Sequence, residues 1–354
     1  MAVKVGKRII KDTKNIEKEV HKFYSKLYST KNICDNKIKQ YLGEIENPCL
    51  TEENANLCEG DITVEELTFA LKNMKLNKAP GADGLTTEFY REFWPDIQGI
   101  VAHSINESYR KGIMSYSQRK GIITLIFKNG ERENLQNWRP ITLLNIDYKL
   151  IATVLSNRLQ KVLHTLISED QVGYVKGRRS TDVARLIQDV IDYANMQQTE
   201  WSIFFVDFHK AFDTLEWNFI QNCLKDFGFK EGFMKWVSVL YKDIFNSVIL
   251  NGRFTENIYP SRGVRQGCPL SALLFILAIE MIAIKLRNTT NVKGINVGLS
   301  NNEVKIAQLA DDMTLFLKDT NSARNALSII DTFGEISGVQ LKKKQNQSFM
   351  VRED

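Results

Sequence analysis

The chain has 354 residues, which is enough for two or three packed units with sizeable cores. Hydrophobic residues make up 43% and charged residues 25%, as is ordinary for a soluble globular protein. The net charge of +5 is compatible with a polyanionic partner but does not require one.

The cysteines and the apolar stretches bear on the cellular setting. The five cysteines are odd in number and none lies in a C-x-x-C pair. This argues against a disulfide framework or a zinc ribbon and favours a reduced, intracellular compartment, either nucleus or cytoplasm. Residues 1–14 are basic and polar and lack the apolar core of a signal peptide. The apolar stretch over residues 270–286 is interrupted by Glu280 and Lys285, so it predicts a buried helix rather than a membrane span.

Two helices are predicted in the first 80 residues. Apolar residues recur at helical spacing from Ile16 to Tyr28, which indicates an amphipathic helix with one apolar face. Residues 31–48 are polar and predict a linker. Thr63 and Glu66 form a capping box ahead of an apolar run, which predicts the start of the second helix.

The middle of the chain predicts a hairpin and two further helices. Residues 121–127 are mainly β-branched and apolar, and the Asn-Gly pair at residues 129–130 is typical of a hairpin turn. Helical patterns follow over residues 148–163 and 181–193.

An acidic residue follows a short apolar run in the second half of the chain. Residues 203–206 predict a strand buried on both faces, and Asp207 comes directly after it. Burying a carboxylate is costly unless something compensates its charge, so stability alone does not explain an aspartate here.

Two further carboxylates stand between the apolar runs of residues 304–310 and 313–317, which predict a β-hairpin with Asp311 and Asp312 at its turn. Aspartate is common in turns, so turn chemistry is one interpretation. Two adjacent like charges, however, repel each other unless a cation lies between them. If the hairpin and the strand before Asp207 share one sheet, three carboxylates converge and divalent ions become their natural counter-charge. Two such ions about 3.5–4 Å apart assist in-line phosphoryl transfer, the chemistry of nucleotide polymerisation.

Five sequence blocks resemble, in their order and content, the reverse transcriptase of LINE-type (non-LTR) retrotransposons. The resemblance spans the chain from about residue 15 to the C-terminus. Its blocks are NKAPGADGL at 77–85, WRPITLLN at 138–145, DFHKAFD at 207–213, RQGCPLS at 265–271 and LADD at 309–312. The first block is predicted to be a loop, either a plain turn between helices or a segment near template or primer.

The resemblance implies catalytic and metal-binding roles. Asp207, Asp311 and Asp312 match the palm aspartates that hold two Mg²⁺ ions, or Mn²⁺ in their place, with Asp311 the surer ligand of the hairpin pair. Phe212 matches the aromatic gate that blocks a ribonucleotide's 2′-hydroxyl, and core packing is its alternative interpretation.

The resemblance also implies an RNA template, a DNA primer and a deoxynucleoside triphosphate (dNTP) as partners. Arg139 matches the fingers arginine on the incoming triphosphate, Lys128 loosely matches a second cation, and Gln266 matches the glutamine beside the nucleotide. Arg178 and Arg179 are expected to contact the template backbone. The alternatives are a surface arginine for Arg139, a plain loop for Gln266 and a solvated charged loop for the last pair.

The fold implied is α+β, a right-hand polymerase palm with mixed fingers. The palm is expected to be a small antiparallel ferredoxin-like sheet backed by helices. The expected division is an N-terminal helical extension at 1–50, fingers with part of the palm at 51–200, and palm at 201–354. The palm is also expected to include residues 79–120.

Several features depart from the family pattern. Leu309 stands where phenylalanine or tyrosine is usual. The block at residues 337–341 usually continues with Asn and then Lys-Ser or Lys-Thr, but these positions are Lys342, Gln345 and Asn346, so the general-acid lysine is not matched. No thumb or endonuclease segment is recognised, which predicts a fragment of a larger polyprotein or a remnant reading frame.

Two other functions compete with reverse transcription. One is an RNA-dependent RNA polymerase, against which Phe212 argues, because such an enzyme must admit the 2′-hydroxyl. The other is a catalytically inactive remnant that only binds nucleic acid. No membrane partner is expected, and the sequence does not indicate an oligomeric state.

Overall fold

The chain folds into two compact units, each assembled from three separate stretches. The computed structural model describes residues 2–6, 8–196, 201–297, 302–342 and 348–351. Unit 1 comprises Met1–Thr30, Asn56–Leu159 and Phe229–Ser271, and unit 2 comprises Lys31–Ala55, Gln160–Gly228 and Ala272–Asp354. Residues 79–120, which the sequence analysis expects to belong to the palm, lie in unit 1.

Unit 1 is built on a four-stranded sheet with the order β4-β3-β6-β7. β3 (Lys120–Phe127) and β4 (Trp138–Leu143) form the predicted antiparallel hairpin, with the short helix η1 (Leu135–Asn137) in its loop. β6 (Phe245–Leu250) runs parallel to β3, and β7 (Arg253–Phe254) pairs antiparallel with β6.

The other elements of unit 1 are mostly helical. α4 begins with the predicted capping box: the Thr63 hydroxyl accepts a hydrogen bond from the Glu66 backbone N–H, and the Glu66 carboxylate accepts one from the Thr63 backbone N–H. The elements are β1 (Val3–Val5), β2 (Arg8–Ile10), α1 (Thr13–Leu27), α4 (Val64–Asn73), α5 (Thr87–Glu92), α6 (Trp94–Lys111), α7 (Tyr116–Arg119), α8 (Ile146–Val162) and α12 (Glu231–Tyr241).

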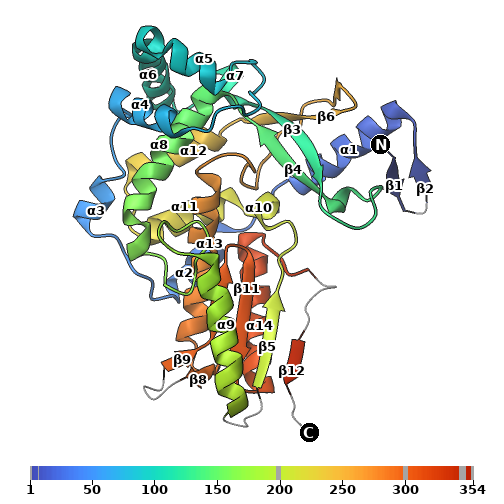
Figure 1. The fold of residues 1–354 in the computed structure, drawn as a ribbon, viewed down its shortest axis with the longest axis vertical. Coiled ribbons are helices and arrows are strands. Elements are labelled where there is room, and N and C mark those ends of the chain that lie inside the picture. The colour runs from blue at the N-terminus through green and yellow to red at the C-terminus, as the bar shows by residue number, and fades with distance from the viewer. Residues whose placement is uncertain (1, 7, 197–200, 298–301, 343–347, 352–354) are drawn as a thin grey trace. The chain divides into compact units, whose positions relative to one another are not determined.

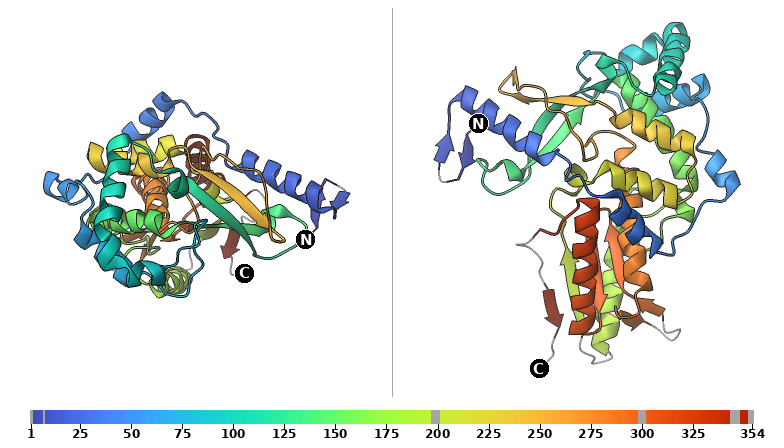
Figure 2. Two further views of the ribbon diagram at one scale, coloured as in Figure 1. Left: turned by 90° about the horizontal axis from the view of Figure 1, so that it is seen from above. Right: turned by 180° about the vertical axis from the view of Figure 1, so that it is seen from behind.

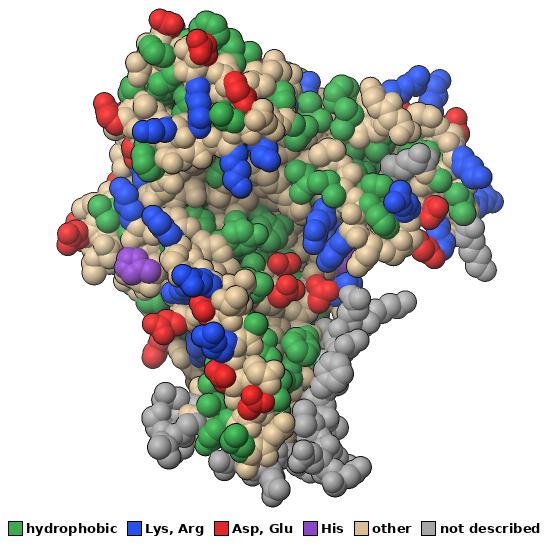
Figure 3. All heavy atoms as spheres, viewed as in Figure 1, with side chains coloured by type: hydrophobic (Ala, Val, Ile, Leu, Met, Phe, Trp, Pro, Cys, Tyr) green, Lys and Arg blue, Asp and Glu red, His purple; other side chains and the backbone are tan. Residues whose placement is uncertain are grey.

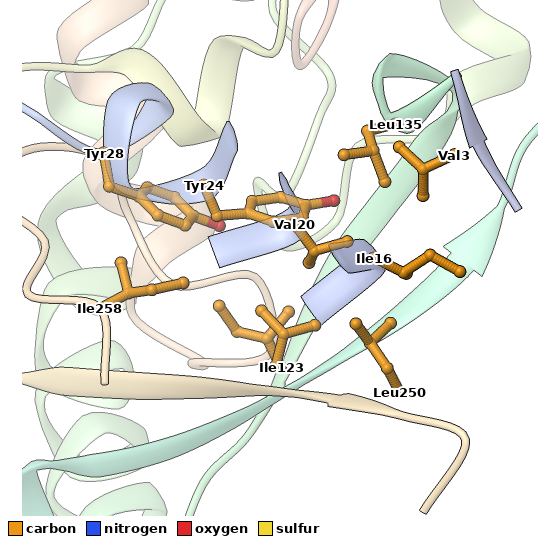
Figure 4. Close-up of a cluster of buried hydrophobic side chains, with 10 residues drawn as sticks. Val3, Ile16, Val20, Tyr24, Tyr28, Ile123, Leu135, Leu250 and Ile258 are labelled. Atoms are coloured by element: carbon orange, nitrogen blue, oxygen red, sulfur yellow. The ribbon is translucent and has the colours of Figure 1, made fainter. Parts of the chain in front are cut away.

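Helix α1 supplies one side of a buried cluster in unit 1. Ile16, Val20 and Tyr24 form its predicted apolar face and are all buried. Figure 4 shows these side chains over Ile123 of β3 and Leu250 of β6. Apolar burial of this kind, at about 25 cal/mol per Å², holds the helix on the sheet.

Unit 2 contains the four-stranded sheet that follows the predicted palm topology. Its strands, in the order β10-β11-β5-β12, are all antiparallel to their neighbours. They are β5 (Trp201–Val206), β10 (Ile306–Leu309), β11 (Asp312–Leu317) and β12 (Ser348–Val351), with α14 (Thr320–Ser337) between the last two. Helices between β5 and β10 complete the β-α-β-β-α-β order of a ferredoxin-like fold (Figure 1).

Helices cover both faces of this sheet. Val190 and Ala194 of α9 (Ser180–Met196) pack with Ile203 of β5 and Phe316 of β11 in one buried cluster. Figures 1 and 2 show α9 on one face and α14 on the other. The helices thereby cover the apolar strands along most of their length. The strand ends that carry Asp207 and Asp312 are less buried.

The predicted linker over residues 31–48 is wrong, because it contains helix α2 (Asp35–Gly43). Three of its apolar side chains, Ile38, Tyr41 and Leu42, are buried. These three residues form one narrow apolar face on an otherwise polar helix. An apolar pattern of only three residues is too short to predict a helix from the sequence.

The remaining elements of unit 2 are helices and one short hairpin. They are α3 (Glu52–Asn56), η2 (Leu163–Thr165), α10 (Ala211–Thr214), α11 (Trp217–Asp226), α13 (Ser271–Asn288), β8 (Ile295–Val297) and β9 (Asn302–Val304). α13 is the buried helix that the sequence predicts over residues 270–286. Within the described ranges, no helix is both long enough and apolar enough to cross a membrane.

Candidate active site

The two acidic elements predicted from the sequence are neighbours in the sheet of unit 2. The antiparallel register pairs Val206 of β5 with Met313 of β11. The adjoining residues, Asp207 and Asp312, therefore occupy neighbouring positions at the same end of the sheet. Facing residues on antiparallel strands have Cα atoms about 4.5–5.5 Å apart. Figure 3 shows acidic side chains grouped near this end of β5 and β11.

The third aspartate lies in the predicted hairpin turn. Leu309 of β10 pairs with Asp312 of β11, so Ala310 and Asp311 are the two residues of the turn. Ala310 has a φ of +58°. This left-handed conformation is what a two-residue hairpin turn requires at its first position, and it costs a residue with a Cβ about 1–3 kcal/mol.

A buried glutamine, which the sequence analysis did not single out, holds this turn. The Gln171 Oε1 atom accepts hydrogen bonds from the backbone N–H groups of Ala310 at 2.9 Å and Gly173 at 2.8 Å, and its Nε2 donates to the Ala310 carbonyl at 3.3 Å. Gln171 is 0% exposed. Its bonds to both polar backbone groups of Ala310 offset the cost of the turn and fix the backbone beside Asp311.

Gly173 lets the loop after α8 approach the turn closely. A Cβ atom at this position would lie 2.4 Å from the Ala310 nitrogen, well inside van der Waals contact. The only hint in the sequence is a Gln-x-Gly pattern at residues 171–173, and no local rule connects this pattern to a turn far along the chain.

The carboxylates suit a hard divalent cation. Mg²⁺ takes oxygen ligands and is usually bound by one or two carboxylates together with water and substrate phosphates. Asp207 and Asp312 supply two such groups at an open strand end, with Asp311 next to them in the chain. In the parts of the chain that the structure describes, no three or more His, Cys, Asp or Glu side chains form a preassembled metal cluster.

A lysine lies against the first of these aspartates. The Lys342 Nζ atom is 2.9 Å from Asp207 Oδ2, and the Lys342 backbone N–H donates to the Asp207 carbonyl at 3.0 Å. Both side chains are 37% exposed. A cation is therefore already paired with the carboxylate in this structure.

The charges of this site shift the pKa values of two ring side chains, Tyr174 and His209. Burial raises the pKa of the Tyr174 hydroxyl, and the negative charge of Asp311 raises it further. Burial lowers the pKa of His209, and the positive charges of Lys210 and Lys342 act in the same direction, whereas Asp207 opposes them.

Phe212 lies on α10, five residues after Asp207. Its half-buried ring stacks on the ring of Phe275, with centroids 4.3 Å apart and planes 16° from parallel. The contact gives the ring a packing partner and also fixes its orientation. It is thus compatible with both interpretations of Phe212.

The two candidate cations of unit 1 stand on one exposed hairpin face. Arg139 of β4 faces Ile126 of β3, and Lys128 follows Ile126 by two residues. The Lys128 N–H donates to the Asn137 carbonyl at 2.9 Å, which continues the ladder. Because side chains alternate along a strand, Lys128 and Arg139 share a face, and both are exposed.

Gln266 lies beside the same hairpin. The Thr142 N–H of β4 donates to the Gln266 carbonyl at 2.7 Å. Gly267 has a φ of +116°, and a Cβ atom there would lie 2.5 Å from the Thr142 carbonyl oxygen. A glycine is therefore required at residue 267 on two counts, and it places Gln266 against β4.

The two loop arginines have different surroundings. The Arg178 guanidinium donates to the backbone carbonyls of Ile167, Ser168 and Gln171, so it braces its own loop. The Arg179 side chain is exposed. Template binding by these residues stays a prediction, for which Arg179 has the more accessible side chain.

The first sequence block, residues 77–85, packs on the end of the second. A Cβ atom on Gly81 would lie 2.1 Å from Asn145 Oδ1. The Asn145 amide Nδ2 also donates to the Ser117 carbonyl at 3.1 Å. Burial raises the pKa of Asp83 in this loop and of nearby Asp147. The close approach of Gly81 to Asn145 explains why the loop carries a glycine at residue 81.

Comparison with known proteins assigns the chain to a family. The family described as "Reverse transcriptase (RNA-dependent DNA polymerase)" matches residues 126–352. The chain is 30% identical over 341 residues to the transposon TX1 149 kDa protein of Xenopus laevis, which covers 96% of this chain and 26% of that protein. It is 26% identical over 291 residues to a retrovirus-related Pol polyprotein of the R2 element from Popillia japonica, covering 82% and 39% of the two chains.

A third relative is the Pol polyprotein of element R2DM from Drosophila melanogaster, 26% identical over 316 residues, which cover 85% of this chain and 29% of the relative. The chain thus spans between about a quarter and two-fifths of the length of these relatives. The relatives are retrotransposon proteins, and the family matches more than half of the chain. The chain therefore belongs to the reverse transcriptase family, among the LINE-type, non-LTR retrotransposon proteins.

Proposed function

We propose that this chain carries an RNA-directed DNA polymerase activity, which extends a DNA primer with dNTPs along an RNA template. The observation that carries the proposal is the register of β5 and β11, which brings Asp207 and Asp312 to neighbouring positions beside the turn of Asp311. Membership of the reverse transcriptase family supports the same chemistry.

Asp207, Asp311 and Asp312 would hold two Mg²⁺ ions, or Mn²⁺ in their place. When bound, such ions promote attack by the primer 3′-hydroxyl on the α-phosphorus and neutralise charge on the triphosphate. The contribution of the protein is mainly positioning and electrostatics, as in other phosphoryl transfers. Gln171 serves this purpose by fixing the turn that carries Asp311.

Arg139 and Lys128 would bind the triphosphate. They share one exposed face of the β3–β4 hairpin, so both charges are available to one polyanion. The planar Arg139 guanidinium can donate two parallel hydrogen bonds to phosphate oxygens, whereas Lys128 acts as a point charge. Gln266, held against β4, would lie beside the nucleotide.

Phe212 would select deoxynucleotides. Its stacking on Phe275 restrains the ring. A restrained ring next to the sugar leaves no room for a 2′-hydroxyl, which favours a DNA product over an RNA product.

Primer extension tests the proposal. The purified chain, an annealed RNA template and DNA primer, dNTPs and Mg²⁺ are expected to give extended primer. Asp312→Asn should reduce the rate by roughly 10²-fold or more, because it removes a carboxylate that would hold the metal ions. Asp331→Asn, an exposed carboxylate on α14, is the matched control and should extend like the parent. Equal extension by all three proteins would contradict the proposal, and binding without any extension would favour a nucleic-acid-binding remnant.

A further inference from the structure

The segment before residue 343 is held beside Asp207 by its backbone. The Lys342 N–H donates to the Asp207 carbonyl at 3.0 Å, and the His209 N–H donates to the Gln340 carbonyl at 2.8 Å. Between these two bonds, Phe208 and Leu341 form an antiparallel bridge. Residues 340–342 therefore form a short ladder with residues 207–209, which fixes position 342 next to the aspartate.

The side chain at this position carries a positive charge to the carboxylate. The Lys342 Nζ atom lies 2.9 Å from Asp207 Oδ2. An ammonium at this distance neutralises the carboxylate, but it has three donors and no acceptor. The ammonium therefore balances the charge of Asp207, but it cannot bind several oxygen ligands at once as a divalent metal ion does.

We propose that Lys342 is a tethered counter-ion that competes with the divalent cation for Asp207. This inference rests on the proposed function, since it assigns Asp207 as a metal ligand. In the metal-free protein the ammonium offsets the repulsion between Asp207 and its acidic neighbours. The ammonium contacts the Oδ2 atom of Asp207, so a divalent ion must either displace it from that oxygen or bind beside it. In both cases the positive charge of Lys342 opposes the ion. The chain therefore binds metal more weakly than it would with a neutral residue at position 342.

The expected size of the effect follows from exposure. Both side chains are 37% exposed, so water screens the pair in part. We expect removal of the charge to tighten metal binding by about two- to fivefold, a range typical of partly exposed pairs. The difference should shrink at high salt, because screening weakens interactions between exposed charges.

The experiment is a Mn²⁺ titration of the whole chain, with free Mn²⁺ followed by electron paramagnetic resonance and no substrate present. The variants are Lys342→Asn and Lys342→Gln, which remove the charge, and Lys342→Arg, which keeps it. Lys318→Gln is the matched control, because Lys318 is exposed and lies beyond the opposite end of β11 from Asp312. Thermal melts without metal check that each variant is folded.

The proposal predicts tighter Mn²⁺ binding for Lys342→Asn and Lys342→Gln, and affinity like the parent for Lys342→Arg and Lys318→Gln. In an Asp207→Asn background, Lys342→Asn should no longer change the affinity, because the pair is already broken. Metal binding by the parent with no change, or a loss, in the two neutral variants would overturn this inference alone. Failure of the parent and every variant to bind Mn²⁺ would overturn this inference and the role of Asp207 as a metal ligand in the free protein, whereas the proposed function is overturned only by the primer-extension test.

Discussion

Gly173 is the residue at which the loop after α8 meets the aspartate hairpin. Its backbone N–H shares the Gln171 side-chain oxygen with the Ala310 N–H. The adjacent Asp311 depends on this contact for its position, although neither Gly173 nor Gln171 is expected to touch substrate. At this scale, the geometry of the proposed site depends on residues that shape the backbone as well as on the carboxylates.

We expect Gly173→Ala to impair the site. The new methyl group would lie 2.4 Å from the Ala310 nitrogen, so the turn must shift. The expected cost is roughly 1–3 kcal/mol of unfolding free energy. Primer extension should fall by roughly 10²-fold, since displacements near 1 Å have such effects. Gly43→Ala is the matched control, because nothing lies within 4 Å of a Cβ there. Equal behaviour of the two variants in urea unfolding and in extension would contradict the role of Gly173.

Phe212 is the residue that we propose as the selector between deoxynucleotides and ribonucleotides. Phe212→Val should reduce the preference for dNTPs over ribonucleotides by roughly tenfold or more, because the smaller side chain admits the 2′-hydroxyl. Single-nucleotide incorporation with dNTP and ribonucleotide in separate reactions measures the ratio. Phe254→Val, which changes a 54% exposed ring in unit 1, should leave the ratio unchanged. A parent protein that prefers ribonucleotides would instead favour an RNA-dependent RNA polymerase.

Helix α13 contains a buried glutamate, Glu280, in the core of unit 2. Glu280 is 1% exposed, and its neighbour Arg287 also donates two hydrogen bonds to Asp170. Because Arg287 is shared between two carboxylates, it compensates Glu280 incompletely. Burial raises the pKa of Glu280 to about 7, whereas the positive charge of Arg287 lowers it in part. The helix is therefore more stable with Glu280 protonated.

The unfolding free energy should therefore depend on pH through Glu280. The folded pKa of about 7 lies above the ordinary glutamate pKa of 4.5. The contribution is fully present below pH 4.5 and is lost as the pH rises through 7. A difference of this size corresponds to about 3 kcal/mol. Urea unfolding at pH 5 and pH 7.5 should show that Glu280→Gln removes most of this dependence, whereas Glu335→Gln, on exposed α14 surface, retains it. An unchanged pH dependence in Glu280→Gln would contradict the assignment.

Across the whole molecule, local patterns predict the elements and long-range contacts decide the rest. The apolar runs before Asp207 and around Asp311 were sufficient to predict the strands and the hairpin, because buried strands need continuous apolar residues. Gln171 could not be predicted as part of the site, since it hydrogen-bonds to Ala310 across 139 positions. The three-stretch composition of each unit is likewise a property of contacts, which the sequence of any one stretch does not contain.

The resemblance supplied the roles, and the structure adds the surroundings of each residue. Arg139 and Lys128 share an exposed face, as a shared phosphate would require. Arg178, by contrast, donates to three backbone carbonyls, which its neighbours in sequence do not reveal. The pairing of Lys342 with Asp207 could not be predicted from the sequence either, because the two residues are far apart along the chain.

The central claim is that Asp207 and the hairpin aspartates hold a common divalent ion, and metal-directed cleavage tests it most directly. When hydrogen peroxide and ascorbate are added, Fe²⁺ bound in place of Mg²⁺ reduces the peroxide to hydroxide and a hydroxyl radical, which cuts the backbone near the ion, and ascorbate regenerates the Fe²⁺. The account predicts cuts both beside residue 207 and beside residues 311–312, suppressed by excess Mg²⁺ and by Asp207→Asn. Cuts at only one of these places, or at neither, would contradict it.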